Sequence, residues 1–198
     1  MKILFTSDLH SITHAYRDFV DLLENKNYDI GIIAGDLGND FSIVNEFILM
    51  LTVTKKLILV IPGNHDRFNW RRRENIYNIH WKKIKIGKHF FVGYRYTLLE
   101  KKEQELERDL QKIKNKVDQE TVFVTHSPAY GILDEPSRIH IGSKALRNFI
   151  KERKPMLHLH GHAHLKFGWE NKSINGAYYK SRKFISIDLE TGFKEEIE

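Results

Sequence analysis

The chain has 198 residues, carries a formal charge of +6 and contains no cysteine. This length is typical of one compact domain, and we expect residues 1–198 to form a single unit. The lack of cysteine excludes disulfide bonds and thiolate metal sites, so oxygen atoms and imidazole nitrogens would have to bind any metal. The basic charge is compatible with an anionic substrate, nucleic acid included, but the charges of both signs are interleaved, which favours a solvated, lysine-rich surface over a dedicated polyanion groove.

No segment of the sequence predicts export or membrane insertion. The apolar start, residues 1–5, is too short for the core of a signal peptide. No apolar run approaches the length of a membrane span, and the longest, residues 57–61, is typical of a buried strand. We therefore expect a soluble protein with no membrane partner, and the absence of disulfides favours a cytoplasmic location.

The first third of the chain alternates short apolar runs with amphipathic segments. The runs predict buried strands, whereas the spacing of apolar residues in the longer segments predicts helices. In chain order we expect a strand at 2–7, a helix at 13–25, a strand at 30–34, a helix at 41–54 and a strand at 57–61. This β-α-β-α-β order is the pattern of a parallel sheet with right-handed crossovers.

The remainder of the chain predicts a second group of strands. In chain order we expect a β-hairpin at 83–86 and 89–93, a long exposed helix at 98–117, a strand at 121–125, a helix at 143–151 and a strand at 156–160. Ser143 is the expected N-cap of the last helix. The segment 165–189 alternates and carries turn signals, so it predicts antiparallel strands. Because no linker or repeat interrupts the pattern, the sequence predicts one α/β domain with a mixed, double sheet.

Five short polar clusters stand directly after apolar runs, at or near the ends of predicted strands. They are Asp8-Leu9-His10, Gly35-Asp36, Gly63-Asn64-His65-Asp66, Thr125-His126-Ser127 and Gly161-His162-Ala163-His164. Strand ends in an open α/β sheet gather ligands at one edge, so we expect these side chains to converge. Any one cluster arises easily by chance, whereas all five in this arrangement indicate a metal site.

The clusters combine carboxylate, carboxamide and imidazole groups, which bind divalent first-row metals. Two such metals, about 3.5–4 Å apart, hold the attacking and leaving oxygens of a phosphoryl displacement and lower the pKa of a shared water. With the carboxylates of Asp8 and Asp36 and one bridging hydroxide, two divalent ions keep about one positive charge, which favours phosphate oxygens. The residues therefore predict a hydrolytic site for phosphate esters.

The sequence resembles the calcineurin-like metallophosphoesterase superfamily in five motifs that follow the family's order. The matching motifs are Asp8-x-His10, Gly35-Asp36, Gly63-Asn64-His65-Asp66, His126 and Gly161-His162-x-His164. Residues 125–134 and 142–147 are also similar to small prokaryotic members of the superfamily. The resemblance implies a four-layer α-β-β-α sandwich, in which two mixed sheets are flanked by helices.

The resemblance also implies a role for each motif residue. The implied ligands of the first metal are Asp8, His10 and His164, those of the second are Asn64, His126 and His162, and Asp36 is implied to bridge both. His65 would not bind metal but would lie over the substrate and stabilise or protonate the leaving oxygen. Asp66 could orient His65. Two divalent ions are expected as cofactors: manganese first, with iron, nickel and zinc as alternatives.

Departures from the family pattern narrow the expected function. Ser11 stands where many relatives have glycine, and its side chain could restrict the pocket. The Asp-Arg-Gly signature of some phosphatase branches does not follow Gly35-Asp36, which argues against a protein phosphatase. We predict a phosphodiesterase for small or nucleotide-like esters, with a metal-bridging hydroxide as nucleophile, because a short chain leaves an open site. The alternatives are a phosphomonoesterase, a nuclease and a non-enzymatic scaffold that binds other proteins.

Other histidines lack a motif context. His158 and His160 lie on the strand before Gly161 and are expected in the core or behind the ligands. The histidines expected on the surface or in packing are His14, His80, His89 and His140.

Two further segments have alternative interpretations. Arg71-Arg72-Arg73 could clamp an anion beside the metals, because arginine suits phosphate, or could begin a solvated helix. The nearby Phe68 and Trp70 could stack a base or pack their loop. Tyr94-Arg95-Tyr96, which follows a predicted strand, could line the pocket.

Overall fold

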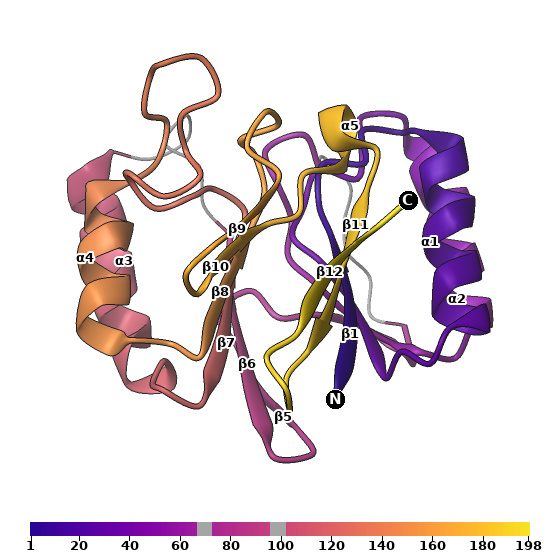
Figure 1. Cartoon of the computed structure of the whole chain (residues 1–198), viewed down its shortest axis with the longest axis horizontal. Helices are drawn as coiled ribbons and strands as arrows, with labels where there is room; N and C mark the ends of the chain where they lie inside the picture. The colour runs from indigo at the N-terminus through magenta and orange to yellow at the C-terminus, as the bar shows by residue number, and fades with distance from the viewer. Residues whose placement is uncertain (67–72, 96–101) are drawn as a thin grey trace.

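The computed structural model describes residues 1–66, 73–95 and 102–198 and shows two mixed β-sheets packed face to face between helices (Figure 1). The first sheet contains β1 (Lys2–Thr6), β2 (Ile30–Ile33), β3 (Leu57–Val60), β4 (Ile76–Asn78), β11 (Phe184–Asp188) and β12 (Lys194–Ile197). The second contains β5 (Lys83–Ile86), β6 (His89–Tyr94), β7 (Thr121–Thr125), β8 (Leu157–His160), β9 (Gly168–Glu170) and β10 (Ser173–Asn175). The four-layer fold class expected from the resemblance is confirmed.

The longer helices form the two outer layers. The described helices are α1 (Thr13–Asn25), α2 (Phe41–Val53), α3 (Glu103–Ile113), which continues as a 3₁₀ turn (Lys114–Lys116), α4 (Lys144–Arg153) and α5 (Tyr178–Ser181). In Figure 1, α1 and α2 cover the first sheet, α3 and α4 cover the second, and the short α5 lies at one edge. Among the described residues, no helix has both the length and the apolar character needed to cross a bilayer.

Alternation along the strands divides the apolar side chains into three layers. In β1, Ile3 and Phe5 point into the layer between the sheets, whereas Leu4 points towards α1 and α2. In β7, Val122 and Val124 join the layer between the sheets, and Phe123 packs under α3 and α4. This period of two is what a strand buried on both faces requires, and it explains why these runs are almost wholly apolar.

The parallel strands place their carboxyl ends at one edge of the molecule. Strands β1, β2, β3 and β4 pair in parallel, as do β6, β7 and β8. The loops that follow them are joined by backbone hydrogen bonds, Asp8 N–H to the Gly35 carbonyl and Gly161 N–H to the His126 carbonyl, both 2.9 Å. This edge is therefore where the polar clusters meet.

The C-terminal region differs from the predicted run of antiparallel strands. Strand β10 pairs antiparallel with β9 but parallel with β8, and residues 178–181 form α5. The next strand, β11, joins the other sheet, antiparallel to β1. The antiparallel pairings of β9 with β10 and of β11 with β1 confirm part of the prediction. The parallel pairing of β10 with β8 and the helix at 178–181 contradict the rest, because alternation in a sequence indicates a strand but not its partner or direction.

Helix boundaries on the second sheet are set by side-chain caps. The Ser143 hydroxyl accepts the Leu146 N–H at 3.0 Å, as expected for an N-cap. The carboxylate of Glu103 accepts N–H groups of Lys144 and Ala145, which ties the start of α3 to the start of α4. The described part of α3 begins at Glu103, and residues 98–101 of the predicted helix lie outside the described residues.

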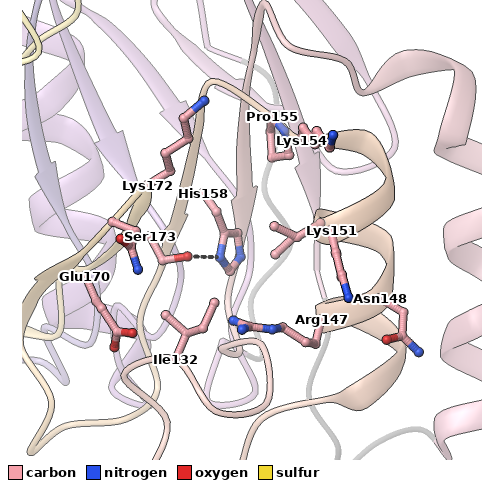
Figure 2. A pocket seen from close by; sticks show the side chains of 12 residues that line it. Ile132, Arg147, Asn148, Lys151, Lys154, Pro155, His158, Glu170, Lys172 and Ser173 are labelled. Carbon is pink, nitrogen blue, oxygen red and sulfur yellow. Dashed lines mark hydrogen bonds between the residues drawn. The ribbon is translucent and has the colours of Figure 1, made fainter.

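The second sheet extends beyond the helices that cover it. The apolar layer under α3 and α4 takes its strand residues from β6 and β7. Beside it, a cavity of about 590 Å³ lies between α4 and the β9–β10 hairpin, with His158 and Ser173 among its lining residues (Figure 2).

Candidate metal centre

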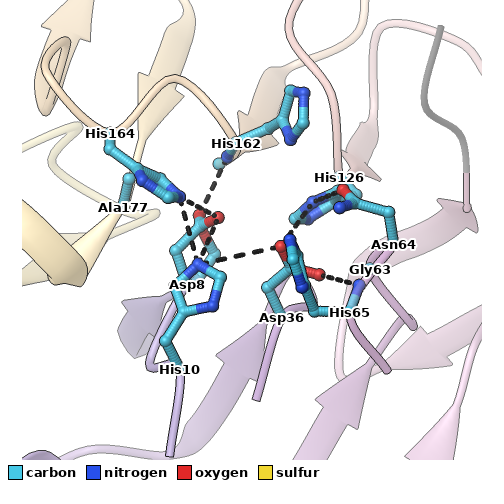
Figure 3. Close-up of polar contacts among 12 residues, drawn as sticks. Asp8, His10, Asp36, Gly63, Asn64, His65, His126, His162, His164 and Ala177 are labelled. Carbon is cyan, nitrogen blue, oxygen red and sulfur yellow. Dashed lines mark hydrogen bonds and ion pairs between the residues drawn. The ribbon is translucent and has the colours of Figure 1, made fainter. Parts of the chain in front are cut away.

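Two groups of side chains that can each hold a metal ion lie at the carboxyl ends of the strands (Figure 3). The first ligand group is Asp8, His10 and His164, and the second is Asp36, His126 and His162. Within each group, the candidate ligand atoms all lie within 4.8 Å of one another. The Asn64 side-chain oxygen lies 3.0 Å from His126 Nε2, so the fold brings all seven sequence-predicted ligands together.

The loops reach this arrangement through unusual backbone conformations. Asp8, His10, Asp36 and His162 have φ angles of 55°, 47°, 55° and 66°, in the left-handed region that residues with a Cβ rarely occupy. Glycine is required at two close approaches, because a Cβ at Gly63 would overlap the Asp36 side chain and one at Gly161 would overlap Ser7. Backbone strain of this kind clusters where a structure holds a functional site.

Each carboxylate keeps one oxygen free for the centre. Asp8 Oδ2 accepts hydrogen bonds from the Ser7 hydroxyl and, at 2.8 Å, from the His162 N–H, while Asp8 Oδ1 lies 3.1 Å from His164 Nε2. Asp36 Oδ1 accepts the His65 N–H at 2.8 Å. Its other oxygen lies 3.4 Å from His126 Nε2 and 3.8 Å from His10 Nε2, between the two ligand groups.

A backbone carbonyl fixes the orientation of the His126 imidazole ring. Its Nδ1 donates to the Ala34 carbonyl at 2.7 Å, which leaves Nε2 facing Asp36 and Asn64. A backbone carbonyl in this position is a common way to fix the ring of a metal-binding histidine. Nitrogen and oxygen donors converge without any cysteine, as suits a divalent first-row metal, so the residues present fit a metal pair.

The carboxylates and imidazoles of the centre shift one another's pKa values. Burial opposes ionisation of Asp8 and Asp36, but hydrogen bonding with His164 and the charge of His126 outweigh it, and both pKa values are lowered. For His126, burial is outweighed by the Asp36 and Asp8 carboxylates, which raise its pKa to about 9. Burial, followed by the charge of His126, lowers the pKa of His162 to about 4. The carboxylates are therefore ionised, as cation ligands must be.

His65 lies beside the first ligand group, with its ring centre 5.1 Å from that of His10. Its Nδ1 lies 3.3 Å from the Asn39 side-chain nitrogen, which can only donate. The neutral ring then carries its proton on Nε2, where it can donate to a substrate. Asn39 was not anticipated: it stands three residues after Asp36, but nothing in the sequence separates it from an ordinary loop asparagine.

Asp66 has a different contact from the one suggested by the resemblance. Instead of bonding to His65, its carboxylate accepts backbone N–H groups of Asp36, Leu37 and Gly63 at 2.8–2.9 Å. Burial is the main cause that raises its pKa to about 6. Asp66 thus joins the loop after β2 to the loop after β3, and the expectation that it orients His65 was wrong.

Residues of the C-terminal region complete the surroundings of the first ligand group. The Tyr179 ring on α5 packs against His10 and His164, with ring centres 5.1 Å apart in each case. Arg182 lies over the same ring at 5.8 Å. Because α5 follows the last motif, no recognised pattern pointed to Tyr179.

The remaining sequence candidates lie elsewhere. Tyr94 is buried under α3, where its hydroxyl donates to Asp109 at 2.9 Å, so it does not line the pocket. His158 and His160 are buried, as expected. Arg73 and Glu74 are not helical, which contradicts a helix at this point. The candidates that lie outside the described residues are Phe68, Trp70, Arg71, Arg72 and Tyr96.

Two of the isolated histidines were also placed correctly by the sequence. His14 is exposed on α1, and His140 packs at the surface with its Nδ1 2.8 Å from Asp134. Ser11 lies near the centre, but its hydroxyl accepts the Asp40 N–H at 3.4 Å, at the start of α2. Its side chain therefore supports the loop after β2.

Comparisons with known proteins agree with this geometry. A family model described as calcineurin-like phosphoesterase matches residues 1–166. A search of curated proteins finds no match. Among solved structures, the protein TT1561 of Thermus thermophilus has a TM-score of 0.74 at 16% identity, covering 98% of this chain and 97% of that chain.

Two further solved structures are similar over most of their length. A dimetal phosphatase from Danio rerio has a TM-score of 0.67 at 10% identity, covering 94% of this chain and 91% of that chain. A protein described as a novel archaeal phosphodiesterase has a TM-score of 0.56 at 16% identity, covering 100% and 99%. At these identities the three similarities establish a shared fold.

Proposed function

Because the chain belongs to the calcineurin-like phosphoesterase family, we propose that it hydrolyses phosphate diesters with two divalent cations. One observation carries the proposal: Asp36 Oδ2 lies between the two ligand groups, 3.4 Å from His126 Nε2 and 3.8 Å from His10 Nε2. A carboxylate oxygen shared in this way is suited to bridge two cations. The first ligand group would hold one metal, and the second, with Asn64, would hold the other.

The metal pair, when bound, supplies a hydroxide nucleophile near neutral pH and positive charge that stabilises the phosphoryl oxygens. Side chains of the protein orient the ligand atoms and contact the leaving group. The hydrogen bonds at Asp8 and Asp36 leave one carboxylate oxygen of each directed at the centre. His65, with its proton on Nε2, donates a hydrogen bond to the leaving oxygen and stabilises the negative charge that develops there. Removing one such donor typically lowers turnover about 10²- to 10³-fold.

A diester substrate is favoured by the accessibility of the first ligand group. The side chains of His164 and His10 are 30% and 16% exposed, so the centre is reached from solvent. An open approach accommodates the second alcohol of a diester, including a nucleotide-like one. A phosphomonoesterase is the alternative.

Manganese is the metal we propose, on the basis of the oxygen ligands offered by Asp8, Asp36 and Asn64. The four imidazoles also suit iron, nickel and zinc, so metal analysis of the purified protein decides between them. A cytoplasmic location, favoured by the cysteine-free sequence, stays a prediction that cell fractionation would check.

Hydrolysis of bis-p-nitrophenyl phosphate and p-nitrophenyl phosphate, with Mn²⁺ added, tests the reaction and the substrate class. We expect the diester to have the higher kcat/KM. A higher value for the monoester would replace the diesterase proposal by the phosphomonoesterase. Hydrolysis of neither, by protein that contains two metals, would favour a binding scaffold.

The role of His65 is tested with His65→Ala, and His14→Ala serves as the matched control because His14 is an exposed histidine outside both ligand groups. We expect His65→Ala to lower kcat about 10²- to 10³-fold with unchanged metal content. The loss should be larger for phenyl than for p-nitrophenyl esters, because phenolate holds more negative charge on its oxygen than p-nitrophenolate does. Equal losses for both leaving groups would contradict the role of His65 as a donor to the leaving oxygen.

A further inference from the structure

The cavity beside α4 is separate from the metal centre, since none of its lining residues belongs to either ligand group. Its volume of about 590 Å³ falls within the range of pockets that bind small organic molecules. Two polar residues at its base are buried: His158 and Ser173 lie on β8 and β10, and His158 Nδ1 is 3.2 Å from the Ser173 hydroxyl. Buried side chains from two strands of the second sheet thus form the base of the cavity.

The walls of the cavity are cationic. Arg147, Lys151 and Lys154 come from α4 and its C-cap, and Lys172 comes from the turn between β9 and β10. Among the described residues Glu170 is the single carboxylate that lines the cavity, so four cations and one anion give these lining residues a net charge of +3. Within residues 1–66, 73–95 and 102–198, none of the four cationic groups forms an ion pair, which leaves their charge available to a ligand.

Helix electrostatics do not account for this arrangement. Cations in the last turn of a helix are stabilised by its dipole, and this explains Lys151 and Lys154. Arg147, however, lies near the start of α4, where the dipole disfavours a cation, and Lys172 belongs to another element. The convergence of free cations from two elements on one cavity raises the local positive potential.

The cavity also has an apolar lining, and its acidic side chain lies opposite two of its basic side chains. Ile132, Ile150 and Pro155 line it, so it is suited to more than an inorganic ion. Figure 2 shows Glu170 across the cavity from Arg147 and Lys151. A ligand that matches this pattern carries an anionic group at one end, an apolar body, and hydroxyl or amino donors at the other end.

We propose that this cavity binds a small organic phosphate of nucleotide size, with the phosphate against Arg147 and Lys151 and the sugar hydroxyls towards Glu170. Arginine offers a planar fork that matches two phosphate oxygens, and lysine adds a compact charge. The site is independent of the hydrolytic reaction, because it needs neither the metals nor His65.

Calorimetric titration of adenosine 5′-monophosphate into the full chain with excess EDTA tests the proposal, because chelation removes any binding through metals. The test variant is Arg147→Glu with Lys151→Glu. The control is Arg17→Glu with Lys114→Glu, which changes the net charge equally at two exposed residues outside the cavity. We expect one site per chain, weakened at least about tenfold by the test variant and less than about twofold by the control.

Amide chemical-shift changes in the unmodified chain provide a second measurement that does not depend on the folding of a variant. Addition of the nucleotide should shift residues 147–158 and 170–173 and leave the loops around Asp8 and Asn64 unchanged. The proposal is overturned by the absence of binding, by equal weakening in both double variants, or by shifts confined to the metal-centre loops. Binding of a single-stranded oligonucleotide without binding of the mononucleotide would also overturn it, in favour of a nucleic-acid surface.

Discussion

At the scale of single residues, the metal centre depends on hydrogen-bond partners that fix the orientation of each functional side chain. His126 donates to the Ala34 carbonyl, and Asp8 accepts from the His162 N–H, so each presents its remaining atom to the centre. His65 depends on the weaker contact, a 3.3 Å approach to the side chain of an exposed residue, Asn39. The orientation of His65 is therefore the part of the centre most open to change by mutation.

Asn39→Ala should lower kcat about two- to tenfold, the effect of one hydrogen bond, while metal content stays unchanged. The loss should grow for phenyl relative to p-nitrophenyl esters, because Asn39 acts through the proton on His65. Steady-state kinetics with both leaving groups measure the effect, and Asn27→Ala, at an exposed asparagine outside the centre, is the control. A loss that is the same for both esters would argue that Asn39 only supports its loop.

At the scale of elements, strands β7, β8 and β10 enclose a histidine that is not part of the metal centre. His158 Nε2 lies 2.8 Å from the Thr125 hydroxyl, which donates its own proton to the Ser127 carbonyl. The Thr125 oxygen must therefore accept from Nε2, and Nδ1 accepts from Ser173. Burial, and secondarily the neighbouring His160, lowers the pKa of His158, so the folded protein holds this ring neutral.

This burial makes stability fall on acidification. Below pH 6.5, the ordinary value for histidine, the unfolded chain binds a proton at residue 158 that the folded chain does not bind. The free energy of unfolding should thus decrease by about 1.4 kcal/mol per pH unit from this residue alone, down to its lowered pKa. Urea unfolding with EDTA between pH 7.5 and 5 should show a shallower decrease for His158→Gln. Identical slopes for both proteins would mean that His158 titrates normally when folded.

The strands also show which parts of the fold can be predicted from the sequence and which cannot. Strands 30–33, 57–60 and 121–125 were predictable because burial on both faces demands an unbroken apolar run. The ligands were predictable because parallel strands place their ends together. Strand β4, with only three residues, and the parallel pairing of β10 with β8 were not, because they depend on contacts with distant strands. The roles of Asn39 and Tyr179 at the centre were not predictable for the same reason, because both depend on contacts with distant residues.

At the scale of the whole molecule, the metal centre connects the two sheets. Asp8, His10 and Asp36 follow strands of the first sheet, whereas His126, His162 and His164 follow strands of the second. Each ligand group contains residues from both sheets. Bound cations would therefore act as cross-links between the two halves of the sandwich, and their effect should appear in the stability of the whole fold.

Metal addition should raise the unfolding temperature of the chelated protein, because the two ligand groups form only when both sheets are in place. Each site contributes about 2.7 kcal/mol when free metal is 100 times its Kd, and a protein of this size gains about 2–4 °C per kcal/mol. Thermal unfolding followed by circular dichroism, with EDTA and then with Mn²⁺, measures the shift. Asp36→Asn should lose most of it, because the proposed bridge disappears, whereas Asp18→Asn, at an exposed carboxylate on α1, should keep it.

The metal-free form of Asp36→Asn should fold, since the asparagine has the same shape and keeps a side-chain oxygen that can accept the His65 N–H. A small shift in this variant therefore reports lost metal binding and not a damaged fold. If Asp36→Asn instead keeps the full shift and two metals per chain, Asp36 does not bridge them. The centre would then consist of two independent sites, each held by its own ligand group, and the link between the sheets would not depend on Asp36.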